Sequence, residues 1–259
     1  MTDAAPVLTA DDGVVRVITL NRPHVRNAID IPLRVALADA IETAMADRSI
    51  RAIVLTGSGG TFCSGGDIAT MERMPPEHSR PRAEAAQRVI RAIWTGPTPV
   101  VAAVEGAAFG AGTALALACD RVVASTDSIF GTTFTGVGLA GDMGIFSSLP
   151  DRVGPAAARQ LLMFPRRVRG DEAERIGLVD ATSEPGQALT QAMSDARRMA
   201  AGPPLALRTI KSILGGPRRD RLDVLDIEID HQVRLFDSED FGEGAAAFVA
   251  RRQPTFTGR

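Results

Sequence analysis

Two glycine-rich turns contain the residues whose types and spacing could do chemistry. They are residues 61–68 (TFCSGGDI) and 105–112 (EGAAFGAG), and each stands between a strand-like apolar run and a helix-like run. Amides at the start of a helix have no intrahelical acceptor, and glycines let another molecule approach them closely. Two such turns could aim two N–H donors at one oxygen that gains negative charge, which is an oxyanion hole.

One glycine-rich turn alone is typical of an ordinary strand-to-helix connection. The surroundings of this pair are more specific. Apolar runs at 52–57 and 99–104 precede the turns, and Leu-Asn-Arg-Pro at 20–23 lies upstream, before Arg-Asn-Ala at 26–28. In this order and spacing, the segments resemble the enoyl-CoA hydratase/isomerase, or crotonase, superfamily from about residue 14 to residue 256.

The resemblance implies an acyl-CoA ligand and a spiral of β-β-α units. In that family, two amides hold the thioester carbonyl of an acyl-CoA, and the matching positions here are Gly66 and Ala111. Coenzyme A is then part of the substrate, and no metal or redox cofactor is expected. The resemblance also implies a homotrimer or a hexamer.

The acids depart from the hydratase pattern. Family hydratases have one glutamate three residues after the second donor and another after a Phe-Gly pair, where this chain has Ala114 and Phe134. Neither side chain can move a proton, so hydration by two carboxylates is not expected. The segment 138–144 resembles the stretch in which family isomerases have an aspartate, which implies Asp142 as the proton carrier. Phe134, Ala114 and Leu139 would give it apolar surroundings that raise its pKa.

The residues alone favour another role for Asp142. An aspartate directly before Met-Gly-Ile-Phe suits a helix N-cap. A cap bond would lower the carboxyl pKa, whereas a proton shuttle needs a raised one.

The predicted substrate contacts are Ala114, Phe134 and Leu139, named above, and six further residues: Arg26, Ser64, Asp67, Ile68, Trp94 and Phe256. Arg26 is a candidate for a CoA phosphate, since arginine binds phosphate through a fork of donors, although a solvated surface charge is the alternative. Trp94 alternatively belongs to the core. Ala69 stands where many family members have a lysine beside the adenosine phosphate.

The periodicity predicts an α/β chain. Strands are expected at 14–20, 52–57, 100–104, 121–125 and about 177–181, and helices at 33–45, 83–94, 110–118 and 155–163. Alternating strands and helices favour parallel pairing through right-handed crossovers. Segment 74–81 has three prolines in eight residues and is predicted to be a mobile loop.

The C-terminal part is predicted to be wholly helical. We divide the chain into a core, residues 1–195, and a helical region, residues 196–259. The resemblance implies that the core binds acyl-CoA and that the helical region serves oligomerisation and covers the CoA site. Apolar residues recur at helical spacing along 222–236, so this helix has a face that needs a partner. That partner is either the same chain or, as the resemblance implies, another subunit.

Composition limits the partners. The 259 residues are 45% hydrophobic with a formal net charge of −2, which gives no general field for nucleic acid or an anionic membrane. The first residues lack the layout of a signal peptide, and no apolar run has the length of a membrane span, so a cytoplasmic protein is expected. The two cysteines are predicted to be buried, and the three histidines show no metal-ligand spacing.

These observations predict an enzyme that isomerises an unsaturated acyl-CoA through an oxyanion-stabilised enolate, with Asp142 as proton shuttle. Two alternatives stay open on the sequence. One is a non-catalytic acyl-CoA-binding protein of the same fold, and the other is an acyl-CoA hydrolase or decarboxylase.

Overall fold

A six-stranded sheet carries the main core of the protein in the computed structural model, which describes residues 5–217 and 219–259. The strand order is β1-β2-β3-β4-β6-β9, and only the β1–β2 pair is antiparallel. The bounds are β1 Val7–Asp12, β2 Val15–Leu20, β3 Ala52–Gly57, β4 Val100–Val104, β6 Arg121–Ser125 and β9 Ala181–Ser183. The α/β prediction with parallel pairing is therefore confirmed.

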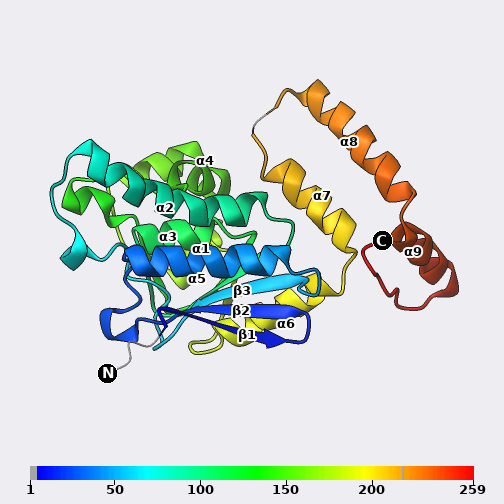
Figure 1. Ribbon diagram of the computed structural model, residues 1–259, viewed down its shortest axis with the longest axis horizontal. Coiled ribbons are helices and arrows are strands. Elements are labelled where there is room, and N and C mark those ends of the chain that lie inside the picture. Colours follow the sequence, from blue (N-terminus) through cyan, green and yellow to red (C-terminus); the bar gives the residue numbers. More distant parts are fainter. Residues whose placement is uncertain (1–4, 218) are drawn as a thin grey trace.

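A smaller sheet of three strands has the order β5-β7-β8. Its strands are β5 Ala107–Phe109, β7 Ile129–Gly131 and β8 Val168–Arg169. Helices α1 to α4 lie on one side of the large sheet and α6 on the other (Figure 1). The helix bounds are α1 Ile31–Ala46, α2 Pro76–Thr95, α3 Ala111–Leu117, α4 Ile145–Met163, α5 Gly170–Arg175, α6 Ala188–Ala200, α7 Pro204–Leu214, α8 Arg221–Phe236 and α9 Glu239–Ala250.

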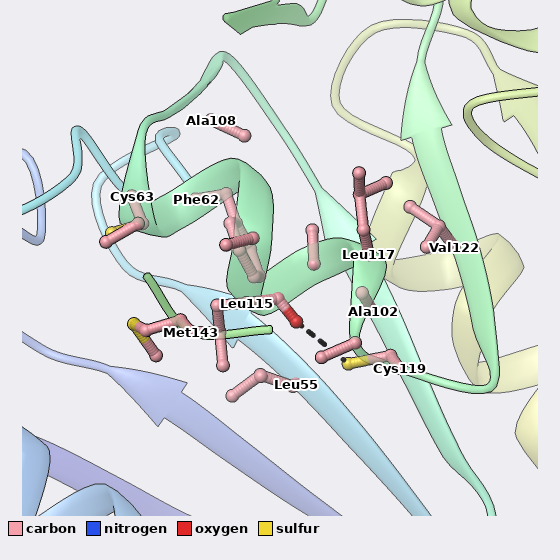
Figure 2. Packing of buried hydrophobic residues seen from close by; sticks show 14 of the residues in the cluster. Leu55, Phe62, Cys63, Ala102, Ala108, Leu115, Leu117, Cys119, Val122 and Met143 are labelled. Carbon is pink, nitrogen blue, oxygen red and sulfur yellow. Dashed lines mark hydrogen bonds between the residues drawn. The ribbon is translucent and has the colours of Figure 1, made fainter. Parts of the chain in front are cut away.

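The central strands are buried on both faces, so their side chains divide between two cores. On β3, Ile53 and Leu55 belong to the larger cluster, beneath α1 to α4, while Ala52 and Val54 pack toward α6. This alternation follows from the two-residue period of a strand. In Figure 2, α3 lies over the strands and adds Leu115 to the larger cluster.

Three predicted elements have other bounds in the structure. Segment 74–81 is not a loop throughout, because α2 begins at Pro76 and includes Pro81. Proline fits the first helical position, and the apolar face of α2 packs on α1. The last predicted strand lies at β9 instead of 177–181, since Gly177 adopts a φ of 75° and turns the chain first. The helix predicted at 155–163 is the second half of α4, which is interrupted by Gly154 at a φ of 77°.

The C-terminal helices α7 to α9 extend away from the core (Figure 1). The predicted boundary at 195/196 falls inside α6, whose Ala196 and Ala200 still pack on the large sheet. Buried Lys211 holds α7 to the core by donating to the Thr98 carbonyl at 2.9 Å and to Asp120 at 2.6 Å. The structural core therefore continues to the end of α6.

Candidate active site

Backbone hydrogen bonds join the two glycine-rich turns. The Cys63 amide donates to the Ala107 carbonyl at 2.9 Å, and the Phe109 amide donates to the Cys63 carbonyl at 3.0 Å. A Cβ on Gly112 would lie 2.4 Å from the Cys63 carbonyl oxygen, so the contact requires glycine there. A side chain at position 112 would push the two turns apart. Their close contact brings Gly66 and Ala111 to the same cavity.

That cavity has a volume of about 270 Å³, and Gly66, Ala111 and Asp142 all line it. Ala111 is the first residue of α3, so its amide has no intrahelical acceptor. Within the described part of the chain, neither the Gly66 nor the Ala111 amide donates to a backbone carbonyl. Both N–H groups are therefore available to a ligand oxygen. Phe134 and Leu139 supply apolar wall.

Asp142 stands in a glycine-rich turn before α4. The N-cap of α4 is Gly144, with no side-chain cap bond, and Asp142 contributes only its carbonyl, which accepts from the Ile145 amide at 3.2 Å. The helix-cap interpretation of Asp142 is therefore wrong. A Cβ on Gly144 would lie 2.6 Å from the Trp94 ring, so the missing side chain lets this turn pack on α2.

Burial raises the pKa of the Asp142 carboxyl above its ordinary value, and the positive charges of Arg34 and Arg82 oppose that rise. Arg34 comes from α1, is buried, and lines the same cavity. The sequence reasoning missed both arginines. A signal for Arg34 was present, because it lies on the helical stripe of Leu37, Ala38 and Ile41, where a charge is unexpected.

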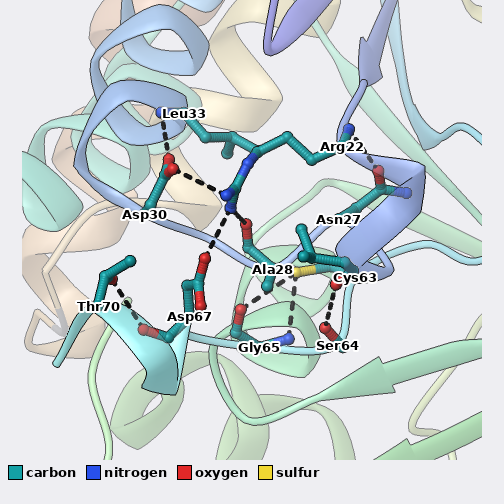
Figure 3. A network of polar contacts seen from close by, with 11 residues as sticks. Arg22, Asn27, Ala28, Asp30, Leu33, Cys63, Ser64, Gly65, Asp67 and Thr70 are labelled. Atoms are coloured by element: carbon teal, nitrogen blue, oxygen red, sulfur yellow. Dashed lines mark hydrogen bonds and ion pairs between the residues drawn. The ribbon is translucent and has the colours of Figure 1, made fainter.

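A network of polar side chains holds the first glycine-rich turn against α1 (Figure 3). Arg22 contacts Asp67 at 3.0 Å and Asp30 at 3.1 Å, and Asp30 caps α1 by accepting from the Leu33 amide at 2.8 Å. Asp67, predicted as a substrate contact, is thus paired with Arg22 and does not line the cavity. Asp67 therefore helps to hold the first glycine-rich turn in position.

The other predicted contacts divide into two groups. Ser64 and Ile68 line the cavity, and Ser64 also lines an adjoining cavity of about 340 Å³ that includes Arg26 and Arg167. Three predicted contacts lie elsewhere in the chain. Ala114 is fully buried inside α3, Trp94 packs on Gly144, and the Phe256 carbonyl accepts from Arg51 at 2.9 Å in the C-terminal region.

Both cysteines are free and buried, and burial raises the pKa of each thiol to about 12. Neither is a candidate nucleophile, since the thiolate is the reactive form. Among the described residues, no group of three or more His, Cys, Asp or Glu side chains could hold a metal ion. In the same part of the chain, every helix is too short or too polar to cross a bilayer.

Comparison with known proteins identifies the family. The model of the enoyl-CoA hydratase/isomerase family matches residues 10–259. The chain belongs to this family. It is 33% identical to crotonyl-CoA hydratase of Syntrophomonas wolfei, covering 96% of this chain and 97% of the relative. It is 32% identical to 1,2-epoxyphenylacetyl-CoA isomerase of Escherichia coli, covering 98% of each.

The fold agrees with the family. A crystal structure of an enoyl-CoA hydratase from Polaromonas sp. JS666 superposes with a TM-score of 0.92 at 36% identity, covering 97% of this chain and 99% of that one. The crotonase-like fold that the sequence resemblance implies is confirmed. Members of the family are enzymes, and both hydratases and isomerases are among the relatives of this chain.

Proposed function

We propose that this member of the enoyl-CoA hydratase/isomerase family isomerises an unsaturated acyl-CoA. One observation carries the proposal: among the described residues, Asp142 is the only acid that lines the cavity with Gly66 and Ala111, whose amides donate to no backbone carbonyl. The two positions where family hydratases have glutamates hold Ala114 and Phe134. A single carboxylate is enough to move a proton between two carbons of the same molecule, as isomerisation requires. Hydration in this family instead uses two carboxylates to activate a water.

In the proposed reaction, the thioester oxygen accepts hydrogen bonds from the Gly66 and Ala111 amides. The Asp142 carboxylate removes an α-proton, and the electron pair of that C–H bond moves into an enolate. The Asp142 carboxylic acid then returns the proton to the γ-carbon, which shifts the double bond. Holding the enolate is the larger energetic task, because loss of one oxyanion donor costs about 3 kcal/mol in other enzymes.

The adjoining cavity is the proposed site for the CoA portion. Arg26 and Arg167 line it, and Ser64 lies between it and the acyl cavity. Guanidinium groups suit the phosphates of CoA, which offer several anionic oxygens. A cytoplasmic location and the absence of any cofactor beyond CoA stay predictions of the sequence.

The decisive experiment incubates the purified protein with 3-enoyl-CoA, 2-enoyl-CoA and saturated acyl-CoA panels and identifies products by mass and chromatography. We expect interconversion of 3-enoyl and 2-enoyl isomers. Crotonyl-CoA hydration is expected to be negligible beside that of a family hydratase assayed in parallel. Robust hydration by protein free of other hydratases would contradict the proposal, and release of free CoA or CO₂ would favour the hydrolase or decarboxylase alternative. Binding without turnover or proton exchange would favour a carrier.

We also propose that α8 joins subunits into a trimer or hexamer. Its apolar stripe is exposed in the single chain: Leu222, Leu225, Ile229, Val233 and Phe236. No described residue of α8 is buried. An apolar stripe of this length in water is typical of a protein-protein interface.

Ile229→Arg is therefore expected to shift the protein from an oligomer to a monomer in size-exclusion chromatography with light scattering, because a charge would be desolvated in the interface. Asp230→Arg places the same side chain on the neighbouring exposed position, off the stripe, and should leave the oligomer intact. A monomeric unsubstituted protein would contradict this assembly.

A further inference from the structure

Two arginines come together beside the acyl cavity without a full set of acceptors. Arg34 on α1 is only 3% exposed and lines the cavity. Its Nη1 donates to the Arg82 carbonyl at 2.9 Å, while its Nε has no hydrogen-bond partner. Arg82 on α2 likewise has a buried Nη2 with no partner. Buried N–H donors that lack acceptors cost free energy. These two guanidinium groups are therefore suited to bind a ligand that brings a hydrogen-bond acceptor.

No carboxylate among the described residues accepts a hydrogen bond from these unpaired guanidinium donors. Asp142 shares the cavity with Arg34, yet the described residues show no ion pair between Asp142 and either arginine. Asp30 is the other nearby carboxylate that influences Arg34, and it is already held by Arg22 at 3.1 Å and by the Leu33 amide at 2.8 Å. The charges of Arg34 and Arg82 therefore both act on Asp142 without a direct ion pair; Arg34 lines the same cavity as Asp142, and Arg82 lies behind it, joined to Arg34 through its carbonyl.

We propose that the acyl group of the substrate bears a carboxylate that binds Arg34 and Arg82, so that the substrate is the CoA monothioester of a dicarboxylic acid. This inference rests on the proposed function, since it assumes an acyl-CoA in the cavity. A carboxylate accepts several hydrogen bonds and pairs well with the planar donor fork of arginine. It would also balance the local charge, because two guanidinium groups would then face two carboxylates.

A solely structural role explains this pair less well. The contact of Arg34 with the Arg82 carbonyl uses one of the five N–H donors of the guanidinium. A buried charge is costly unless it is paired, and a leucine or methionine at position 34 would fit the apolar stripe of α1 without that cost. The retained charge and its free Nε point to an anionic ligand group.

The test measures binding by calorimetry for acyl-CoA pairs of equal chain length, namely pentanoyl-CoA with glutaryl-CoA and hexanoyl-CoA with adipoyl-CoA. We expect the dicarboxylic member of at least one pair to bind about tenfold tighter or more, as befits charge-assisted hydrogen bonds. A third probe, 5-oxohexanoyl-CoA, offers a neutral oxygen acceptor and is expected to bind more weakly than adipoyl-CoA. Equal binding of all members, or preference for the neutral oxygen, would overturn the inference and leave the proposed function intact. Failure of every acyl-CoA to bind would overturn both.

Variants separate this site from general attraction between opposite charges. Arg34→Gln and Arg34→Met should remove most of the dicarboxylic preference and leave the affinity for pentanoyl-CoA and hexanoyl-CoA nearly unchanged. The matched control is Arg88→Gln, because Arg88 also links α2 to α1, through Asp39 at 2.7 Å and Glu42 at 2.5 Å, but lies outside the cavity. It should keep the preference. Equal loss in Arg88→Gln would contradict a site at Arg34. If circular dichroism shows that both Arg34 variants are unfolded, the paired-ligand calorimetry on the unsubstituted protein still tests whether the cavity prefers a dicarboxylic acyl group.

Discussion

Asp142→Asn is expected to lower the turnover number for enoyl-CoA isomerisation by about 10²- to 10⁴-fold, the range that general acid-base groups contribute. Asparagine keeps the shape of the side chain but cannot take up the α-proton, so the Kd for a saturated acyl-CoA should change little. The measurement is steady-state kinetics together with solvent deuterium incorporation at the α- and γ-carbons. Incorporation detects proton removal even when no net product accumulates. Equal incorporation by both proteins would exclude Asp142 as the base.

The same variant has a pH signature. Burial raises the pKa of Asp142 in the folded protein above its ordinary value of 3.8, so ionisation of this carboxyl disfavours the folded state. Arg34 and Arg82, the charged groups that act on it, reduce this effect without reversing it. The free energy of unfolding of Asp142→Asn should therefore exceed that of the unsubstituted protein at pH 7. This difference should vanish below the ordinary pKa, where the carboxyl is protonated in both states. A less stable variant at pH 7 would show that the ionised carboxylate stabilises the fold.

Ala111→Pro is expected to lower kcat/KM by about 10²- to 10³-fold, the usual effect of losing one oxyanion donor. Proline removes the N–H of Ala111, which is the first residue of α3, and the first helical position is the one that tolerates proline best. Chemistry should suffer more than binding, because the enolate oxygen carries more charge than the thioester carbonyl. Stopped-flow or steady-state assays with a 3-enoyl-CoA measure the effect.

The control for this variant is Glu239→Pro, at the first position of α9 and outside the cavity. It should keep both kcat/KM and the melting temperature near those of the unsubstituted protein. Circular dichroism checks that Ala111→Pro is folded, and its spectrum should match that of the unsubstituted protein. A folded Ala111→Pro with unchanged kcat/KM would rule out the Ala111 amide as an oxyanion donor.

The sequence by itself determined the fold class and the positions of the two turns. Strand and helix periods are local properties, so the strands β2, β3, β4 and β6 and the helices α1 and α3 could be predicted from neighbouring residues. The resemblance added the spiral of β-β-α units and the acyl-CoA ligand. It also drew attention to Asp142, and to Ala114 and Phe134 where hydratases have glutamates.

Local patterns failed where packing outweighed propensity. The three prolines at 74–81 predicted a loop, but α2 begins at Pro76, a position that tolerates proline, and packing against α1 supports the helix although Pro81 lies inside it. Asp142 looked like a cap because of the residues that follow it. The structure instead begins α4 after Gly144, whose missing side chain admits the Trp94 ring.

Only the tertiary structure decided which side chains meet. Asp67 pairs with Arg22, 45 residues earlier in the chain, and does not line the cavity. Arg34 and Arg82 come from different helices, and their closeness to Asp142 depends on how α1 and α2 pack beside the turn before α4. Sequence spacing carries no information about such contacts, because they are set by the packing of elements that are far apart in the chain. The charge beside the cavity therefore depends on the tertiary structure. Gly66 and Ala111 were instead predicted as candidate oxyanion donors from the two glycine-rich turns together with the family resemblance.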